Sequence, residues 1–313
     1  MNNTLSINWE ITKKCNLNCI YCRVRGGEEK VDELTEIEAK NIIDKLYPYG
    51  YRHLKFTGGE PLIKDYFWNL VKYAHQKEML VSIFTNGSLI TNKLLVNFKK
   101  YISIVAFSLD SLVDEHNKIL KRDKVLIIMN NIKKIQKLGI SVVISATVSN
   151  ITINDLEELV LFAKDTGINE IKINDFVFNG RANDNEVILK LKRPLIEDQR
   201  YLINIIKSIY HEKILKNYQF RCECSNSDLF ISYKGDLYPC VELSYLSDEY
   251  KIGNLVTDNI KDLLKTNVNF HQQIQDRDYC GYSYLSSTHF SACLNRGGCP
   301  KTLRNYMKLA KTR

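Results

Sequence analysis

Short apolar runs alternate with longer amphipathic stretches from the start of the chain to Asp175. The apolar runs are rich in β-branched and aromatic residues and end in polar turns, as β-strands do. They cover Leu5 to Ile11, His53 to Thr57, Leu80 to Thr85, Ser103 to Leu109, Ser141 to Thr147 and Glu170 to Asp175. Apolar residues at helical spacing predict helices between them. These helices cover Glu36 to Leu46, Tyr66 to Ala74, Val125 to Leu138 and Asn154 to Ala163.

The order of these elements, strand and then helix, is repeated along the chain. It predicts parallel strands joined by right-handed crossovers. Several runs, such as ISIVAFSL and ISVVISAT, are apolar on both faces. That pattern is expected when helices cover the outside of a sheet and other groups fill its inside. We therefore expect an α/β fold, a partial (β/α)6 TIM-like barrel.

The pattern changes after Asn179-Gly180-Arg181 to a polar connection and then one amphipathic helix, Glu197 to Lys216. Beyond it, LFISY-KGD-LYPC predicts a hairpin that turns at Gly235, and Ile252 to Leu255 predicts a short strand. We assign residues 1–195 to the barrel, 196–218 to a bridging helix and 219–313 to a small cysteine-rich domain.

Composition narrows the class of protein. The chain has 313 residues, 44% hydrophobic and 26% charged, which is typical of a folded globular protein. The N-terminus has no signal-peptide pattern, and apolar residues never run unbroken for about 18 positions, so we expect a cytoplasmic protein without a membrane partner. The net charge of +8 comes from lysines spread over the whole chain, as on a solvated surface, which disfavours a nucleic-acid partner.

Cysteine usage points to metal chemistry. Thiols in the cytoplasm stay reduced, so nine cysteines indicate metal or redox sites and not disulfides. Cys15, Cys19 and Cys22 stand close together in the polar loop after the first strand. Three thiolates at this spacing can bind three irons of a cubic cluster and leave the fourth iron open for a ligand. The alternatives are a zinc site, which usually needs a fourth ligand nearby, and unliganded core cysteines.

A second motif, Thr57-Gly58-Gly59-Glu60-Pro61, follows the second strand. Paired glycines let a ligand approach the backbone, and the Glu60 carboxylate can accept a hydrogen bond from an ammonium group. Alone, this motif would be a tight structural turn. Beside the cysteine triplet it predicts a pocket for an amino acid.

Four motifs at successive strand ends together carry a resemblance to a known family. They are CxxxCxxC, GGEP, Thr85-Asn86-Gly87 and Ser108-Leu109-Asp110. In this combination the chain resembles the radical S-adenosylmethionine (radical SAM) superfamily over about its first 180 residues. The resemblance implies a partial six-stranded barrel and a [4Fe–4S] cluster whose open iron chelates the methionine moiety of S-adenosylmethionine. It also implies reductive cleavage to a 5′-deoxyadenosyl radical, with electrons from a flavodoxin or ferredoxin.

The resemblance carries over residue by residue. It implies that Cys15, Cys19 and Cys22 hold the cluster. Tyr21 matches the aromatic residue beside the adenine, Gly58, Gly59 and Glu60 match the methionine amino site, and Ser108 matches a polar contact to the ribose or carboxylate. One stretch departs from the family, because Leu120 stands where an arginine usually follows. We assign the carboxylate contact to Arg122, with Lys121 as the alternative.

Six further cysteines lie in the C-terminal part, at Cys222, Cys224, Cys240, Cys280, Cys293 and Cys299. Their arrangement resembles the SPASM and twitch extensions, which bind auxiliary iron-sulfur clusters. Six thiolates cannot fill two four-ligand sites alone, so we expect one auxiliary [4Fe–4S] cluster, with two as the alternative. We assign Cys222, Cys240, Cys293 and Cys299 as its ligands. A zinc knot is the structural alternative.

Cys224 is separated from Cys222 by one residue, so only one of the two need reach the cluster. We hypothesise that Cys224 is a free thiol that donates a hydrogen atom to a substrate radical. The alternatives are that both cysteines lie at the cluster, one bonded and one only packed against it, or that Cys224 is the ligand and Cys222 is the spare thiol.

The C-terminal extension resembles those of enzymes that modify ribosomally made peptides by epimerisation, crosslinking or oxidation. We expect a peptide substrate. The alternatives are a dehydrogenase or epimerase of a small sugar-like metabolite and a non-catalytic iron-sulfur or zinc scaffold. The GGEP motif argues against the scaffold, because a scaffold has no need of an amino-acid pocket.

Overall fold

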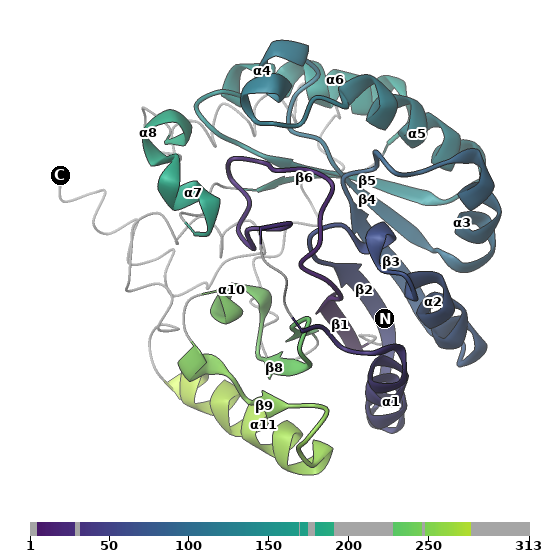
Figure 1. The fold of residues 1–313 in the computed structure, drawn as a ribbon, viewed down its shortest axis with the longest axis vertical. Coiled ribbons are helices and arrows are strands. Elements are labelled where there is room, and N and C mark those ends of the chain that lie inside the picture. The colour runs from purple at the N-terminus through teal and green to yellow at the C-terminus, as the bar shows by residue number, and fades with distance from the viewer. Residues whose placement is uncertain are drawn as a thin grey trace.

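The computed structural model describes residues 5–28, 32–168, 170–174, 179–190, 228–245 and 248–276. Its centre is a curved sheet whose first six strands all run parallel (Figure 1). They are β1 (Leu5–Glu10), β2 (Tyr51–Thr57), β3 (Leu80–Thr85), β4 (Ile104–Ser108), β5 (Ser141–Thr147) and β6 (Glu170–Asn174). Each predicted strand is found, with bounds that differ by at most two residues. The predicted α/β partial barrel is confirmed.

Helices follow the strands along the outside of the curved sheet (Figure 1). They are α1 (Glu36–Leu46), α2 (Phe67–Gln76), α3 (Leu95–Tyr101), α4 (Asp114–Ile119), α5 (Val125–Lys137) and α6 (Leu156–Asp165). The four predicted helices are α1, α2, α5 and α6. The sequence did not predict α3 and α4, because each buries a single side chain, Phe98 and Asn117, and so lacks an apolar stripe.

The two faces of the sheet differ in chemistry. Ile7 and Trp9 of β1 are fully buried in the apolar core with Phe56 of β2 and the inner sides of the helices. The ring centroids of Trp9 and Phe56 lie 5.8 Å apart. Alternate residues point the other way, toward the inside of the barrel. Near the carboxyl ends of the strands that inner face is polar, with Asn8 and Ser108 as examples.

The C-terminal part continues the same sheet. Strand β7 (Asp228–Ile231) pairs in parallel with β1, and β8 (Asp236–Tyr238) and β9 (Gly253–Asn254) add antiparallel strands. The strand order is β6-β5-β4-β3-β2-β1-β7-β8-β9. The hairpin predicted to turn at Gly235 is therefore present, with a left-handed backbone at that residue (φ +85°).

The remaining described helices are α7 (Arg181–Asp184), α8 (Glu186–Leu189), α10 (Val241–Ser244) and α11 (Ile260–Asp276). The bridging helix expected at 196–218 lies outside the described residues, and so do both proposed domain boundaries. Among the helices that are described, none is long and apolar enough to cross a membrane.

Candidate active site

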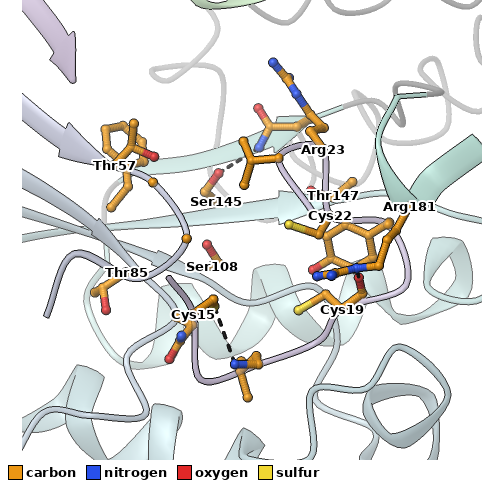
Figure 2. A pocket seen from close by; sticks show the side chains of 18 of the residues that line it. Cys15, Cys19, Cys22, Arg23, Thr57, Thr85, Ser108, Ser145, Thr147 and Arg181 are labelled. Atoms are coloured by element: carbon orange, nitrogen blue, oxygen red, sulfur yellow. Dashed lines mark hydrogen bonds between the residues drawn. The ribbon is translucent and has the colours of Figure 1, made fainter. Parts of the chain in front are cut away.

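A cavity of about 330 Å³ opens at the carboxyl ends of the parallel strands. Barrel enzymes place their sites at this end. The cavity lies between the cysteine loop and the inner face of the sheet (Figure 2). From the sheet, its lining includes Asn8, Thr57, Phe84, Thr85, Ser108, Ser145, Thr147 and Asn174. All of these except Phe84 are uncharged hydrogen-bonding side chains, so the floor can bind polar groups without favouring a charge.

All three cysteines of the triplet line this cavity and are half-buried free thiols. Figure 2 shows Cys19 and Cys22 with their sulfur atoms directed into the same space. Backbone N–H groups point at two of the sulfurs, from Leu17 to Cys15 (3.5 Å) and from Gly26 to Cys22 (3.3 Å). Such bonds favour a sulfur that carries negative charge, as a metal ligand does.

The three thiols are of the kind that a [4Fe–4S] cluster with one open iron takes as ligands. Cys15, Cys19 and Cys22 all line the same cavity. Burial raises the pKa of Cys15 to about 11 and also raises the pKa of Cys19, so only a positively charged group would hold them as thiolates.

The GGEP turn packs directly against the chain segment that leads into the cysteine loop. The N–H of Gly59 donates to the Thr12 carbonyl and the N–H of Glu60 to the Lys14 carbonyl, each at 2.8 Å. A side chain at Gly58 or Gly59 would overlap these carbonyl oxygens. Both glycines also line the cavity. Glycine is therefore required here for close backbone packing as well as for access of a ligand.

Glu60 is fully buried and is already hydrogen-bonded. Its carboxylate accepts from the Thr85 hydroxyl and the Asn86 N–H, both at 2.8 Å, and from the Leu62 N–H at 3.2 Å. Burial raises its pKa to about 7. The carboxylate thus joins the ends of β2 and β3, while Gly58 and Gly59 face the cavity. Its predicted contact with the methionine amino group stays a prediction.

Tyr21, Ser108 and Arg122 all line the cavity. Arg122 is 4% exposed and donates to the Tyr21 hydroxyl and to the Ser108 carbonyl, each at 2.5 Å. Its guanidinium also lies 3.6 Å from the Asp110 carboxylate, to which the Tyr21 hydroxyl donates. Arg122 Nε has no partner among the described residues. The predicted contacts of these three residues with the cofactor remain predictions.

Arg181 is a site residue that the sequence did not identify. It lines the cavity at 6% exposure, and its Nε donates to the Cys19 carbonyl at 2.8 Å. Its Nη1 pairs with Glu28 at 2.7 Å and donates to the Gly26 carbonyl at 3.3 Å. Arg181 therefore holds two carbonyl groups of the cysteine loop, those of Cys19 and Gly26. Its only sequence signal was its place in Asn179-Gly180-Arg181, after which the strand-and-helix pattern changes to a polar connection.

Tyr245 and Val241 form the wall that comes from the C-terminal part. The Tyr245 hydroxyl donates to Glu10 Oε2 at 3.0 Å, and the Arg23 guanidinium lies 4.5 Å from the centre of the Tyr245 ring. Asn179 donates to the Tyr245 carbonyl at 2.6 Å. The sequence did not mark any of these residues as part of the site.

Of the predicted auxiliary ligands, only Cys240 is described. It is a half-buried free thiol directly before α10. The others, Cys222, Cys293 and Cys299, lie outside the described residues, as do Cys224 and Cys280. The auxiliary ligand set and the hydrogen-donor role of Cys224 therefore stay predictions.

Two family models match the chain. The model of the radical SAM superfamily matches residues 9–163, and that of SPASM, an iron-sulfur cluster-binding domain, matches residues 222–292. The first match contains the cysteine triplet and the GGEP turn. The second contains Cys222, Cys224, Cys240 and Cys280.

Similar proteins span nearly the whole chain. Mycofactocin maturase MftC of Mycolicibacterium smegmatis is 25% identical over 94% of this chain and 78% of its own length. MftC of Mycobacterium tuberculosis is 26% identical over the same shares. Among solved structures, Streptococcus suis SuiB bound to S-adenosylmethionine has a TM-score of 0.70 at 18% identity, covering 96% of this chain and 74% of SuiB. The structure of anSMEcpe with bound AdoMet has a TM-score of 0.69 at 15% identity, covering 98% and 99%. At these identities the solved structures show a shared fold.

Replacing Cys15, Cys19 and Cys22 together by alanine should remove about four irons per chain and all cleavage of S-adenosylmethionine. The fold should persist, because the three side chains lie in a loop outside the apolar core. Iron analysis, circular dichroism and 5′-deoxyadenosine formation in an anaerobically reconstituted sample test this. Retained 5′-deoxyadenosine formation would contradict the assignment.

A Gly59→Ala variant should lose the barrel cluster, because the added methyl group overlaps the Lys14 carbonyl and displaces the cysteine loop. Gly139→Ala is the control, since a methyl group at Gly139 meets no atom within 4 Å, although its left-handed backbone (φ +77°) makes alanine there strained. The control should lose about 1 kcal/mol of stability and keep its iron. Equal iron content in the two variants would show that the close packing at Gly59 is not needed.

Arg181→Met should keep the length of the side chain but leave the Cys19 and Gly26 carbonyls without their donor. We expect the reconstituted cluster to be lost to a chelator at least several-fold faster than in the wild type, with little change in melting temperature. Loss of cluster absorbance with time measures this. An unchanged rate would show that Arg181 does not hold the loop.

Proposed function

The chain belongs to the radical SAM superfamily, and we propose that it is an enzyme that modifies a peptide in the cavity between its barrel and its C-terminal wall. It binds a [4Fe–4S] cluster and S-adenosylmethionine in the barrel, and its C-terminal domain is of an iron-sulfur cluster-binding type. The cluster and S-adenosylmethionine together supply reductive cleavage of the cofactor and removal of a hydrogen atom from the substrate. The modification we propose is an epimerisation, a crosslink or an oxidation.

Residues of this chain would position the cluster and the cofactor and would exclude water from the reacting atoms. Cys15, Cys19 and Cys22 hold the cluster at one side of the cavity. Arg122 and Ser108 border the place where the cofactor carboxylate and ribose would bind. The C-terminal wall, with Tyr245, covers the side away from the strands and would keep water from the reacting atoms.

The observation that carries the peptide proposal is the match over both parts of the chain to proteins named as maturases. Solved relatives of the same fold support it. SuiB has been solved bound to the precursor peptide SuiA, and anSMEcpe with bound peptides. The cavity floor also suits a peptide, because its Asn, Ser and Thr side chains can bind both N–H and C=O groups.

The same uncharged floor would bind the hydroxyl groups of a sugar-like metabolite, which is the second candidate. A flavodoxin or ferredoxin is the electron donor that we propose for either substrate. One auxiliary [4Fe–4S] cluster held by Cys222, Cys240, Cys293 and Cys299 remains our proposal for the C-terminal domain.

Anaerobic incubation with candidate precursor peptides, S-adenosylmethionine and a reductant should change one of them. Epimerisation leaves the mass unchanged but introduces deuterium from D2O, whereas crosslinking or oxidation removes two hydrogens. Mass spectrometry reads both results, and the triple cysteine variant is the blank. If sugar-like metabolites are consumed and stimulate 5′-deoxyadenosine formation while every peptide is inert, the peptide proposal is wrong.

A further inference from the structure

The cavity gathers positive charge. Three arginines, Arg23, Arg122 and Arg181, line it, and no aspartate or glutamate is among the described residues of the lining. A guanidinium keeps its charge at every physiological pH. A cleft lined by charges of one sign concentrates their field, so this cavity favours a ligand with a negatively charged group.

Two of the three arginines are engaged in holding the site together. The guanidinium of Arg122 lies 3.6 Å from the Asp110 carboxylate, and that of Arg181 lies 2.7 Å from Glu28. Both also donate to backbone carbonyls, Arg122 to Ser108 and Arg181 to Cys19. The carboxylate of the cofactor is already assigned to Arg122. A negatively charged group of the substrate is therefore left to Arg23.

Arg23 lies on the side of the cavity where a substrate has room. It directly follows Cys22, but Figure 2 shows its side chain directed away from the sulfur atoms of Cys19 and Cys22. Its guanidinium carbon is 4.5 Å from the centre of the Tyr245 ring, in the wall from the C-terminal part. Stacking on a ring fixes the guanidinium by its flat face and not by the N–H groups at its edge.

The buried carboxyl group of Glu10 does not take the place of a ligand here. It lies behind Tyr245, to whose hydroxyl it is bonded, and it does not line the cavity. Burial raises its pKa to about 7, although the charge of Arg23 acts to lower it. Glu10 is therefore only partly ionised at neutral pH and offsets the charge of Arg23 only in part.

We propose that Arg23 binds a carboxylate of the substrate peptide, either an acidic side chain near the modified residue or the carboxyl terminus. This inference rests on the proposed function and names the charge that the peptide brings into the cavity. The class of ligand follows from the group, because a guanidinium stays charged, only donates hydrogen bonds and matches the two oxygens of a carboxylate. The uncharged floor of the cavity would bind the neighbouring main chain of the peptide.

Two variants of Arg23 separate charge recognition from a merely structural stack. Arg23→Gln removes the charge but keeps a planar amide that can pack on the Tyr245 ring. Arg23→Lys keeps the charge but loses the planar fork. Arg25→Gln is the matched control, because Arg25 belongs to the same loop, pairs with Glu28 and Asp184, and is not among the lining residues.

The probe is a fluorescein-labelled form of the peptide that the wild-type enzyme converts, with its Kd measured by fluorescence anisotropy on the reconstituted, cofactor-loaded enzyme. Arg23→Gln should raise Kd about tenfold to a hundredfold, as expected for a lost bond between charged groups. Arg23→Lys should raise it by a smaller factor, and Arg25→Gln should stay within about threefold of the wild type. Equal iron content in all four proteins checks that the loop keeps its cluster.

Modified peptides identify the carboxylate without any change to the protein. Each Asp or Glu of the peptide is replaced in turn by Asn or Gln, and the carboxyl terminus is amidated in a further peptide. One of these changes should weaken wild-type binding about as much as Arg23→Gln does, and it should have no further effect in that variant.

The site is overturned if no neutralised peptide binds the wild type more weakly. It is also overturned if Arg23→Gln raises Kd as much for every neutralised peptide as for the original one. In both cases the wild type still converts the peptide, so the proposed function would stand while this site would not.

Discussion

The contact between two backbone segments, Thr12 to Lys14 and the GGEP turn, is the constraint on which the site depends. Two hydrogen bonds of 2.8 Å join them, and only glycine at positions 58 and 59 permits that separation. The segment from Thr12 leads into the cysteine loop, so the cluster ligands are positioned by the end of β2. Glu60 then extends this unit to β3 through Thr85 and Asn86. Three neighbouring strand ends thus behave as one rigid support.

The opposite side of the cavity is built from residues far away in the sequence. Arg181 holds the carbonyls of the cysteine loop, and Tyr245 approaches from beyond β8 to contact Glu10. Because β7 pairs directly with β1, the C-terminal part is attached to the strand that precedes the cysteines. The cavity wall and the cluster loop therefore share one strand as their common base.

The strands and the helices α1, α2, α5 and α6 could be predicted because their apolar patterns reflect burial that is local in sequence, whereas the 17-residue α11 was not predicted. The cysteine triplet and the GGEP turn could be predicted because their chemistry is contained in a few consecutive residues. Neither kind of signal exists for Arg181, Glu10 or Tyr245. The hydrogen bond between Tyr245 and Glu10 joins residues 235 positions apart, and neither local sequence contains a motif that predicts it. The burial of Glu60 against β3 was missed for the same reason.

The parallel pairing of β1 with β7 has a consequence for biosynthesis. Strand β1 is made first, but one of its edges is completed only when Asp228 to Ile231 have been synthesised. Until then the nascent barrel carries an open strand edge next to a row of apolar side chains, which is a template for wrong pairing between chains. A chain that ends before β7 keeps that edge permanently. Pairing with β7 therefore covers a strand edge of the barrel that would otherwise be open, independently of any cluster in the C-terminal part.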